Sequence, residues 1–234
     1  MKSDTIRIDG IRCRIYMRGS PEVLLIQPEA GRDGGETDRE AGSIAEGADG
    51  PFLLAVFDVE DWNRDLSPWP APPAFGKEAF GGQAERTLSY VRRSLLPELR
   101  ARYGLSEGLP VILGGYSLAG LFALWSVWQT SDFAAAAAAS PSVWFPGWLE
   151  CAGASVPRAR AVYLSLGDRE ERTRNVVMAA VGDRIRAMEK MLREIPGTEC
   201  VLEWNEGNHF KDPDRRCARA FLWCMERLRK MKEK

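Results

Sequence analysis

A serine and the single histidine are the residues of this chain best suited to carry chemistry. Residues 115–120 read Gly-Tyr-Ser-Leu-Ala-Gly and lie between a short apolar run and an apolar stretch of helical type. That context is typical of a nucleophile elbow, a strained turn that exposes the hydroxyl of its central serine. Gly115 and Ala119 supply the small neighbours that such a turn needs. We therefore predict that Ser117 is a nucleophile; the plainer interpretation is a strand-to-helix turn with an N-capping serine.

His209 lies in the stretch Asn-Glu-Gly-Asn-His-Phe at 205–210, after the last expected strand and before the last expected helix. A nucleophilic serine needs a general base within hydrogen-bond reach, and histidine suits that task near neutral pH. The only histidine of the 234 residues therefore falls in the loop where a hydrolase with a parallel sheet requires its base. We predict that His209 is the catalytic base.

An acidic loop lies between the serine and the histidine. Residues 167–175 read Gly-Asp-Arg-Glu-Glu-Arg-Thr-Arg-Asn, and an acid in this place would follow the chain order serine, acid, histidine. The acid would orient the imidazole and stabilise its protonated form. Glu170 is the first choice because it comes three residues after the glycine that ends the strand, and Asp168 is the second. The alternative is a solvated cluster of ion pairs, with the site working as a Ser–His dyad.

Two backbone N–H groups are expected to bind the oxyanion. One is that of Leu118, at the positive end of the helix dipole. The other should come from the loop after the apolar run at 51–58, near Trp62 or Asn63.

Four side chains are expected to contact the substrate: Arg64, Tyr116, Trp69 and Trp144. Arg64 would pair with an anionic substrate or, alternatively, hold its own loop. Four tryptophans are expected in loops on this face, where they would line an aromatic pocket or pack on one another: Trp62, Trp69, Trp144 and Trp148.

Short apolar runs alternate with helical patterns, which predicts an α/β fold: a mostly parallel, doubly wound sheet with helices on both faces. The expected strands cover a hairpin at 6–17 with a type I′ turn at Asp9-Gly10, and the runs at 22–27, 51–58, 110–114, 133–140, 159–166 and 199–204. Alanine propensity favours a helix at 133–140, but the strand–helix rhythm and Pro141 favour a strand there. The candidate site residues then all follow carboxyl ends of strands, where such sheets bind ligands.

The expected helices are at 83–103, 117–129, 176–194 and 213–230. Pro97 should kink or end the first of these, and Asp212 should cap the last, with Pro213 at its first position. The acidic and glycine-rich stretch 28–50 is expected to be a loop with a short helix around 38–46. The proline-rich stretch 59–82 is expected to be a loop throughout.

Composition excludes several classes of protein. Lys and Arg number 32 against 33 Asp and Glu, a net charge of -1, so no nucleic-acid or membrane partner is expected. No apolar run of about 18 residues and no leader-type N-terminus are present. The five cysteines have no paired spacing, which is typical of a reducing cytoplasm and argues against disulfides or a zinc site. We expect one cytoplasmic domain over residues 1–234.

Five stretches together resemble a known family: Asn-Arg-Asp-Leu-Ser-Pro at 63–68, Gly-Gly-Tyr-Ser-Leu-Ala-Gly at 114–120, Ser-Pro-Ser-Val-Trp at 140–144, Ser-Leu-Gly-Asp-Arg-Glu at 165–170 and Gly-Asn-His-Phe at 207–210. In this order they are similar to the esterase branch of the α/β-hydrolase superfamily. That branch includes enterochelin and other ferric-siderophore esterases, S-formylglutathione hydrolases, and feruloyl or acetyl-xylan esterases.

The resemblance implies a serine esterase that hydrolyses carboxylic esters through an acyl-enzyme, with Ser117 and His209 carried over by motif. A small ester is the implied partner, no metal or organic cofactor is implied, and homo-oligomerisation is left open. A thioesterase or an acyltransferase would use the same residues. The rival from another class is a non-catalytic binding protein that keeps the fold.

Overall fold

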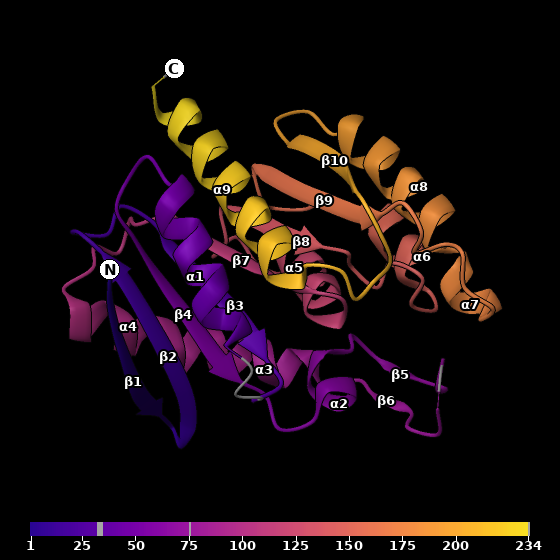
Figure 1. Cartoon of the computed structure of the whole chain (residues 1–234), viewed down its shortest axis with the longest axis horizontal. Helices are drawn as coiled ribbons and strands as arrows, with labels where there is room; N and C mark the ends of the chain where they lie inside the picture. The colour runs from indigo at the N-terminus through magenta and orange to yellow at the C-terminus, as the bar shows by residue number, and fades with distance from the viewer. Residues whose placement is uncertain (32–34, 75, 234) are drawn as a thin grey trace.

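A computed structural model describes residues 1–31, 35–74 and 76–233 of the chain. One sheet of eight strands runs through the described part in the order β1-β2-β4-β3-β7-β8-β9-β10 (Figure 1). Its strands are β1 (Lys2–Ile8), β2 (Ile11–Arg18), β3 (Leu24–Glu29), β4 (Phe52–Asp58), β7 (Val111–Tyr116), β8 (Ala135–Ala139), β9 (Ala161–Gly167) and β10 (Glu199–Asn205). β2 pairs antiparallel with β1 and with β4, and all the other pairs are parallel. The predicted mostly parallel sheet is confirmed.

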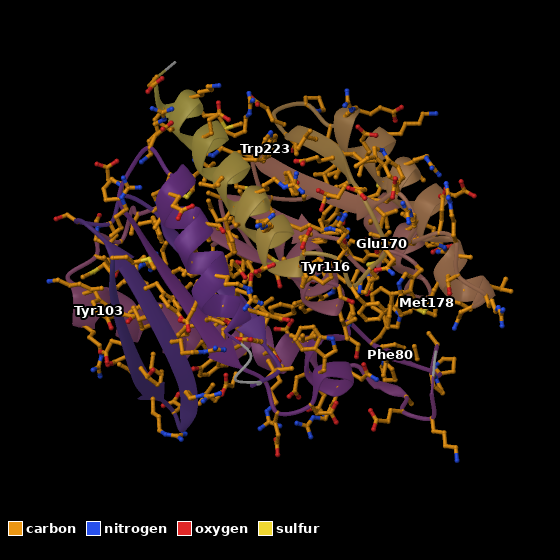
Figure 2. All side chains as sticks on the ribbon, in the orientation of Figure 1. Phe80, Tyr103, Tyr116, Glu170, Met178 and Trp223 are labelled. Atoms are coloured by element: carbon orange, nitrogen blue, oxygen red, sulfur yellow. The ribbon has the colours of Figure 1, made fainter. Side chains whose placement is uncertain are left out.

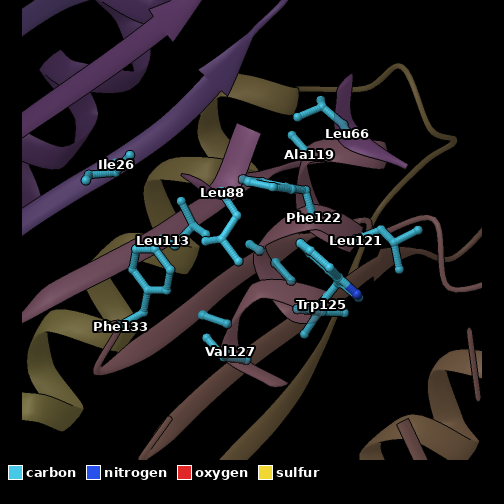
Figure 3. Packing of buried hydrophobic residues seen from close by; sticks show 14 of the residues in the cluster. Ile26, Leu66, Leu88, Leu113, Ala119, Leu121, Phe122, Trp125, Val127 and Phe133 are labelled. Atoms are coloured by element: carbon cyan, nitrogen blue, oxygen red, sulfur yellow. The ribbon is translucent and has the colours of Figure 1, made fainter. Parts of the chain in front are cut away.

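Helices cover both faces of the sheet, as predicted. On one face lie α1 (Glu36–Gly47) and α9 (Pro213–Lys232), which also pack on each other (Figure 1). The other face is covered by α3 (Ala84–Tyr90), the π-helical η1 (Val91–Leu95), α4 (Leu96–Tyr103), α5 (Leu118–Gln129), α6 (Trp148–Gly153) and α8 (Val181–Arg193). Figure 3 shows this second core, where Phe122 and Trp125 of α5 lie among Leu113 of β7, Leu88 and Phe133.

Ala135–Ala139 of the alanine run form the strand β8, as the rhythm of the chain predicted, and all the side chains of this strand are buried. Helices pack closely on both sides of this region of the sheet. A Cβ added at Gly114, on the neighbouring strand, would lie 2.5 Å from the ring of Phe221 in α9. Small residues are therefore required here, and packing overrides the helical propensity of alanine.

The N-terminal hairpin has the predicted turn. Asp9 and Gly10 have φ of 49° and 82°, and a type I′ turn requires positive φ at both central residues. Residues 28–50 contain α1, which is longer than the short helix expected there.

Other predicted elements differ in detail. The helix expected at 83–103 contains η1, which ends two residues before Pro97, because proline cannot donate the regular helical hydrogen bond and its ring displaces the preceding turn. The helix expected at 176–194 is divided at Ala180 into α7 (Val176–Ala179) and α8. Asp212 is the N-cap of α9 and Pro213 is its first residue, as predicted, but the φ of Asp212 is 52° and its side chain makes no capping hydrogen bond.

The loop expected at 59–82 contains three short elements: α2 (Trp62–Leu66) and the paired strands β5 (Pro70–Ala71) and β6 (Phe80–Gly81). α6 was also not predicted. Within the described ranges, none of the helices has both the length and the apolar content that a bilayer span requires.

Candidate active site

Ser117 occupies a strained turn between β7 and α5. Its φ of 58° and ψ of -119° lie in a region that residues with a side chain rarely adopt. Its N–H donates to the carbonyl of Ala139 at 3.1 Å, and its carbonyl accepts from the N–H of Ser142 at 3.0 Å. The turn is thus fixed to the end of the neighbouring strand β8.

Close packing inside the turn explains its small residues. A Cβ added at Gly115 would lie 2.5 Å from the Cβ of Ala119. A Cβ added at Gly120 would lie 3.1 Å from the carbonyl oxygen of Gly115. The turn can therefore form only with small residues, which is the geometry of a nucleophile elbow.

His209 follows β10 and is held by Glu170, which follows β9. The ring atom Nδ1 of His209 lies 2.7 Å from Oε2 of Glu170. The N–H of Glu170 donates to the carbonyl of Gly167 at 3.1 Å, and this turn folds the residue back over the end of its strand. An ionised carboxylate can only accept, so Nδ1 carries the proton and Nε2 keeps a lone pair.

The second oxygen of Glu170 is fully engaged. Oε1 accepts hydrogen bonds from the N–H of Gly167 at 2.7 Å, from Oγ of Ser140 at 2.8 Å and from Nη1 of Arg216 at 2.8 Å. Glu170 is only 8% exposed, and burial alone would raise its pKa. Hydrogen bonds from His209, Gly167 and Ser140 outweigh burial and hold the pKa of Glu170 below its usual value.

Asp168, the second candidate acid, has a different place. Its Oδ1 accepts from the N–H of Gly207 at 2.8 Å, so it braces the loop that carries the histidine. Its side chain is 52% exposed, and it is Glu170 that contacts the imidazole.

Tyr116 lies beside Glu170 near the beginning of α9 (Figure 2). Its hydroxyl donates to the carbonyl of His209 at 2.8 Å and accepts from Nη1 of Arg216 at 3.0 Å. Burial, together with the nearby charge of Glu170, raises the pKa of Tyr116. Tyr116 was predicted to contact substrate; in the structure its hydroxyl binds the loop of the histidine and Arg216.

The sequence interpretation missed Ser140, Ser142 and Arg216. Oγ of Ser142 lies 3.4 Å from Oγ of Ser117. Among the described residues Ser142 is the hydrogen-bond partner of the Ser117 hydroxyl, and no hydrogen bond joins that hydroxyl to His209. In unliganded hydrolases this bond is often long and tightens when substrate binds.

The sequence contains signals for Ser140, Ser142 and Arg216. Both serines belong to the Ser-Pro-Ser-Val-Trp stretch that follows β8. Arg216 lies on the buried stripe of α9 with Cys217, Ala220 and Phe221, a place where an arginine needs a partner.

The expected oxyanion donors lie at the starts of two helices that pack together, α5 and α2. Within the described residues the N–H groups of Leu118, Trp62 and Asn63 have no hydrogen-bond partner. Asp61 caps α2 by accepting from the N–H of Arg64 at 2.9 Å, which leaves the two preceding N–H groups available.

The side chain of Arg64 pairs with its own neighbours, with Asp65 at 2.8 Å and Glu60 at 3.1 Å. These ion pairs agree with the alternative in which Arg64 holds its own loop. Because the guanidinium is already paired within its own segment, nothing in its contacts favours a role in binding an anionic substrate.

The predicted pocket tryptophans pack against neighbouring residues of the protein. Nε1 of Trp69 donates to the carbonyl of Pro146 at 2.9 Å, and Trp144 is 6% exposed with its ring 6.1 Å from that of Phe80. Trp148 was expected in a loop, but it begins α6 and is fully buried against Trp128. Mutual packing describes these rings better than an open aromatic pocket.

The sheet order, the helices on both faces and the elbow after β7 define an α/β-hydrolase fold. No protein-family model matches the sequence and neither does any curated protein.

Solved structures match the fold over nearly the whole chain. An IroE-like serine hydrolase from Shewanella oneidensis is 16% identical, with 98% of this chain and 80% of that one covered and a TM-score of 0.79. The siderophore hydrolase EstB from Aspergillus nidulans is 16% identical, with 97% and 95% covered and a TM-score of 0.74. The enterobactin esterase FES from Shigella flexneri is 16% identical, with 97% and 59% covered and a TM-score of 0.70. These structures share the fold of this chain, and they agree with the predicted α/β-hydrolase fold.

Proposed function

We propose that this chain is a serine hydrolase that cleaves carboxylic esters through an acyl-enzyme. The observation that supports the proposal most directly is the contact of 2.7 Å between Oε2 of Glu170, after β9, and Nδ1 of His209, after β10. The same chain carries Ser117 in a nucleophile elbow. A strained serine, a histidine with a free Nε2 and a buried acid are the three groups that acyl transfer needs.

In the proposed reaction, Oγ of Ser117 attacks the ester carbonyl while Nε2 of His209 takes the hydroxyl proton. The N–H of Leu118 and that of Trp62 or Asn63 bind the oxyanion, and each such donor contributes roughly 3 kcal/mol. The imidazolium gives its proton to the leaving alcohol, and the acyl-enzyme remains on Ser117. His209 then activates a water that releases the acid.

The similar structures suggest which ester substrates to test first. Two of them are a siderophore hydrolase and an enterobactin esterase, so siderophore-type esters and small acyl esters are the first to be tested. Our proposal also retains a single domain and a cytoplasmic setting, supported by five free cysteines.

Intact-mass labelling with a fluorophosphonate tests the proposal without a known substrate. One adduct is expected on the wild type and none on Ser117→Ala. Ser142→Ala is the matched control, because its hydroxyl lies 3.4 Å from that of Ser117, and it should still be labelled. A folded wild-type protein that takes no adduct would instead support a non-catalytic binding protein.

A further inference from the structure

Arg216, in the first turn of α9, is 1% exposed, and its guanidinium reaches the carboxyl ends of four strands. Its polar contacts are Glu170 Oε1 at 2.8 Å, Tyr116 OH at 3.0 Å, Ser140 Oγ at 3.1 Å, and the carbonyls of Glu206 and Asn208, each at 3.1 Å. These partners follow or end β7, β8, β9 and β10.

Burying a guanidinium is strongly unfavourable unless its charge and its N–H groups are satisfied. Here the charge is balanced by Glu170, and Nη2 binds two carbonyls of the loop that carries His209. Tyr116 extends the network, because its hydroxyl accepts from Arg216 and donates to the carbonyl of His209 itself.

We propose that Arg216 is a positioning residue that sets both the place and the electrostatic balance of the Glu170–His209 pair; this inference rests on the proposed function. Oε1 of Glu170 faces Arg216 and Oε2 faces the imidazole, so the guanidinium and the imidazole share one carboxylate. Arg216 acts through these groups and does not itself contact the reacting atoms.

The sharing has a kinetic consequence. Without Arg216 the full charge of Glu170 would favour the protonated imidazole, which cannot act as a base. The acid limb of the pH–rate profile would then move to higher pH.

The other charged and titratable groups near His209 are engaged with other partners, so we expect Glu170 and Arg216 to set the pH of the acid limb. The Tyr116 ring lies 5.0 Å from the imidazole, measured between centroids. On the same loop Lys211 pairs with Glu206 at 2.9 Å, and Asp168 binds the N–H of Gly207. Asp212 precedes α9, and its carbonyl accepts from the N–H of Arg216.

The experiment compares fluorophosphonate labelling rates across pH for the wild type, Arg216→Met, Arg216→Lys and Tyr116→Phe. Arg216→Met should lower the plateau rate by about tenfold to a hundredfold and move the acid limb up by about one pH unit. Arg216→Lys keeps the charge and should keep the limb while lowering the plateau. Tyr116→Phe should lower the plateau with the limb unchanged.

Arg227→Met is the matched control. Arg227 is also on α9, where it stacks on Trp223 and lies far along the helix from Arg216, so its loss should change neither the plateau nor the limb.

Thermal unfolding establishes which variants fold. A folded Arg216→Met with wild-type plateau and limb would overturn the proposal, and so would an Arg216→Lys limb that shifts as far as that of Arg216→Met. If both Arg216 variants fail to fold, a Tyr116→Phe plateau equal to that of the wild type overturns it. A wild type that takes no label at Ser117 is a different result, because it removes the proposed function itself.

Discussion

Glu170 and His209 are joined through Nδ1 of the imidazole, at 2.7 Å from Oε2 of the carboxylate. This bond places the ring proton on Nδ1 and leaves Nε2 as the basic atom. The other oxygen of Glu170 is occupied by Gly167, Ser140 and Arg216, so the carboxylate cannot rotate without breaking three hydrogen bonds. The imidazole is therefore held in one tautomer and one orientation.

Glu170→Gln should lower ester turnover at least about a hundredfold, because an amide can present an N–H to Nδ1 and favour the wrong tautomer. Asp168→Asn keeps an oxygen that can accept from Gly207 and should have a much smaller effect. Steady-state kinetics on an activated aryl ester compare the two variants. If Asp168→Asn proved the more damaging, the acid would be Asp168; a near-normal rate in Glu170→Gln would indicate a Ser–His dyad.

The lowered pKa of Glu170 links the stability of the fold to pH. A carboxyl whose folded pKa lies below its usual 4.5 adds stability above that pH, and this stability is lost as the pH falls through the folded value. Chemical denaturation of the wild type should therefore show a fall in unfolding free energy on acidification below about pH 4.5. In Glu170→Gln this part of the fall should be missing.

Near neutral pH, Glu170→Gln should also lower the unfolding free energy by about 3 kcal/mol, because Arg216 loses its buried counter-charge. The double variant with Arg216→Met should be more stable than the sum of the two single losses predicts. Additive losses would show that the two side chains are not energetically coupled.

The elbow should not accept even one methyl group. Gly115→Ala would place a Cβ 2.5 Å from that of Ala119, and the contact includes backbone atoms at 2.9 Å and 3.0 Å that cannot move independently. We expect loss of fluorophosphonate labelling together with a loss of stability of about 2 kcal/mol or more. Gly42→Ala, in α1 with nothing within 4 Å of the new Cβ, should instead gain about 0.5–1 kcal/mol and label normally. Equal behaviour of the two variants would contradict a sterically closed turn.

Sequence patterns predicted the parallel strands because each contains a short apolar run, although β10 at the edge of the sheet is only partly buried, and they placed Ser117 and His209 because both follow such runs. They could rank Glu170 and Asp168 only by distance along the chain. The turn from Gly167 to Glu170 aims the carboxylate of Glu170 at the imidazole and leaves that of Asp168 half exposed on the N–H of Gly207, and no periodicity encodes that direction.

Two other features were not predicted, for physical reasons. α2, β5 and β6 are too short to show a hydrophobic period, so a proline-rich stretch reads as a loop. Asp212 is the N-cap of α9, as its residue type predicted, but its backbone is left-handed and its side chain makes no capping hydrogen bond, which residue type alone does not show.

A second buried carboxyl, that of Glu40, should make the fold less stable as the pH rises, which is the opposite of the effect of Glu170. Glu40 of α1 is fully buried, and although Nε2 of Gln27 donates to it at 3.0 Å, burial raises the pKa of Glu40 to about 8. A folded pKa above the ordinary 4.5 means that stability is complete below pH 4.5 and falls as the pH rises toward about 8.

Glu40→Gln removes the charge and keeps an oxygen that can accept from Gln27, so its stability should stay level across that range and exceed that of the wild type at the alkaline end. Urea denaturation at a series of pH values measures both curves. Glu46→Gln, an exposed glutamate of the same helix, should follow the wild-type curve. Parallel curves for the wild type and Glu40→Gln would show that the Glu40 carboxyl is already ionised inside the fold at neutral pH.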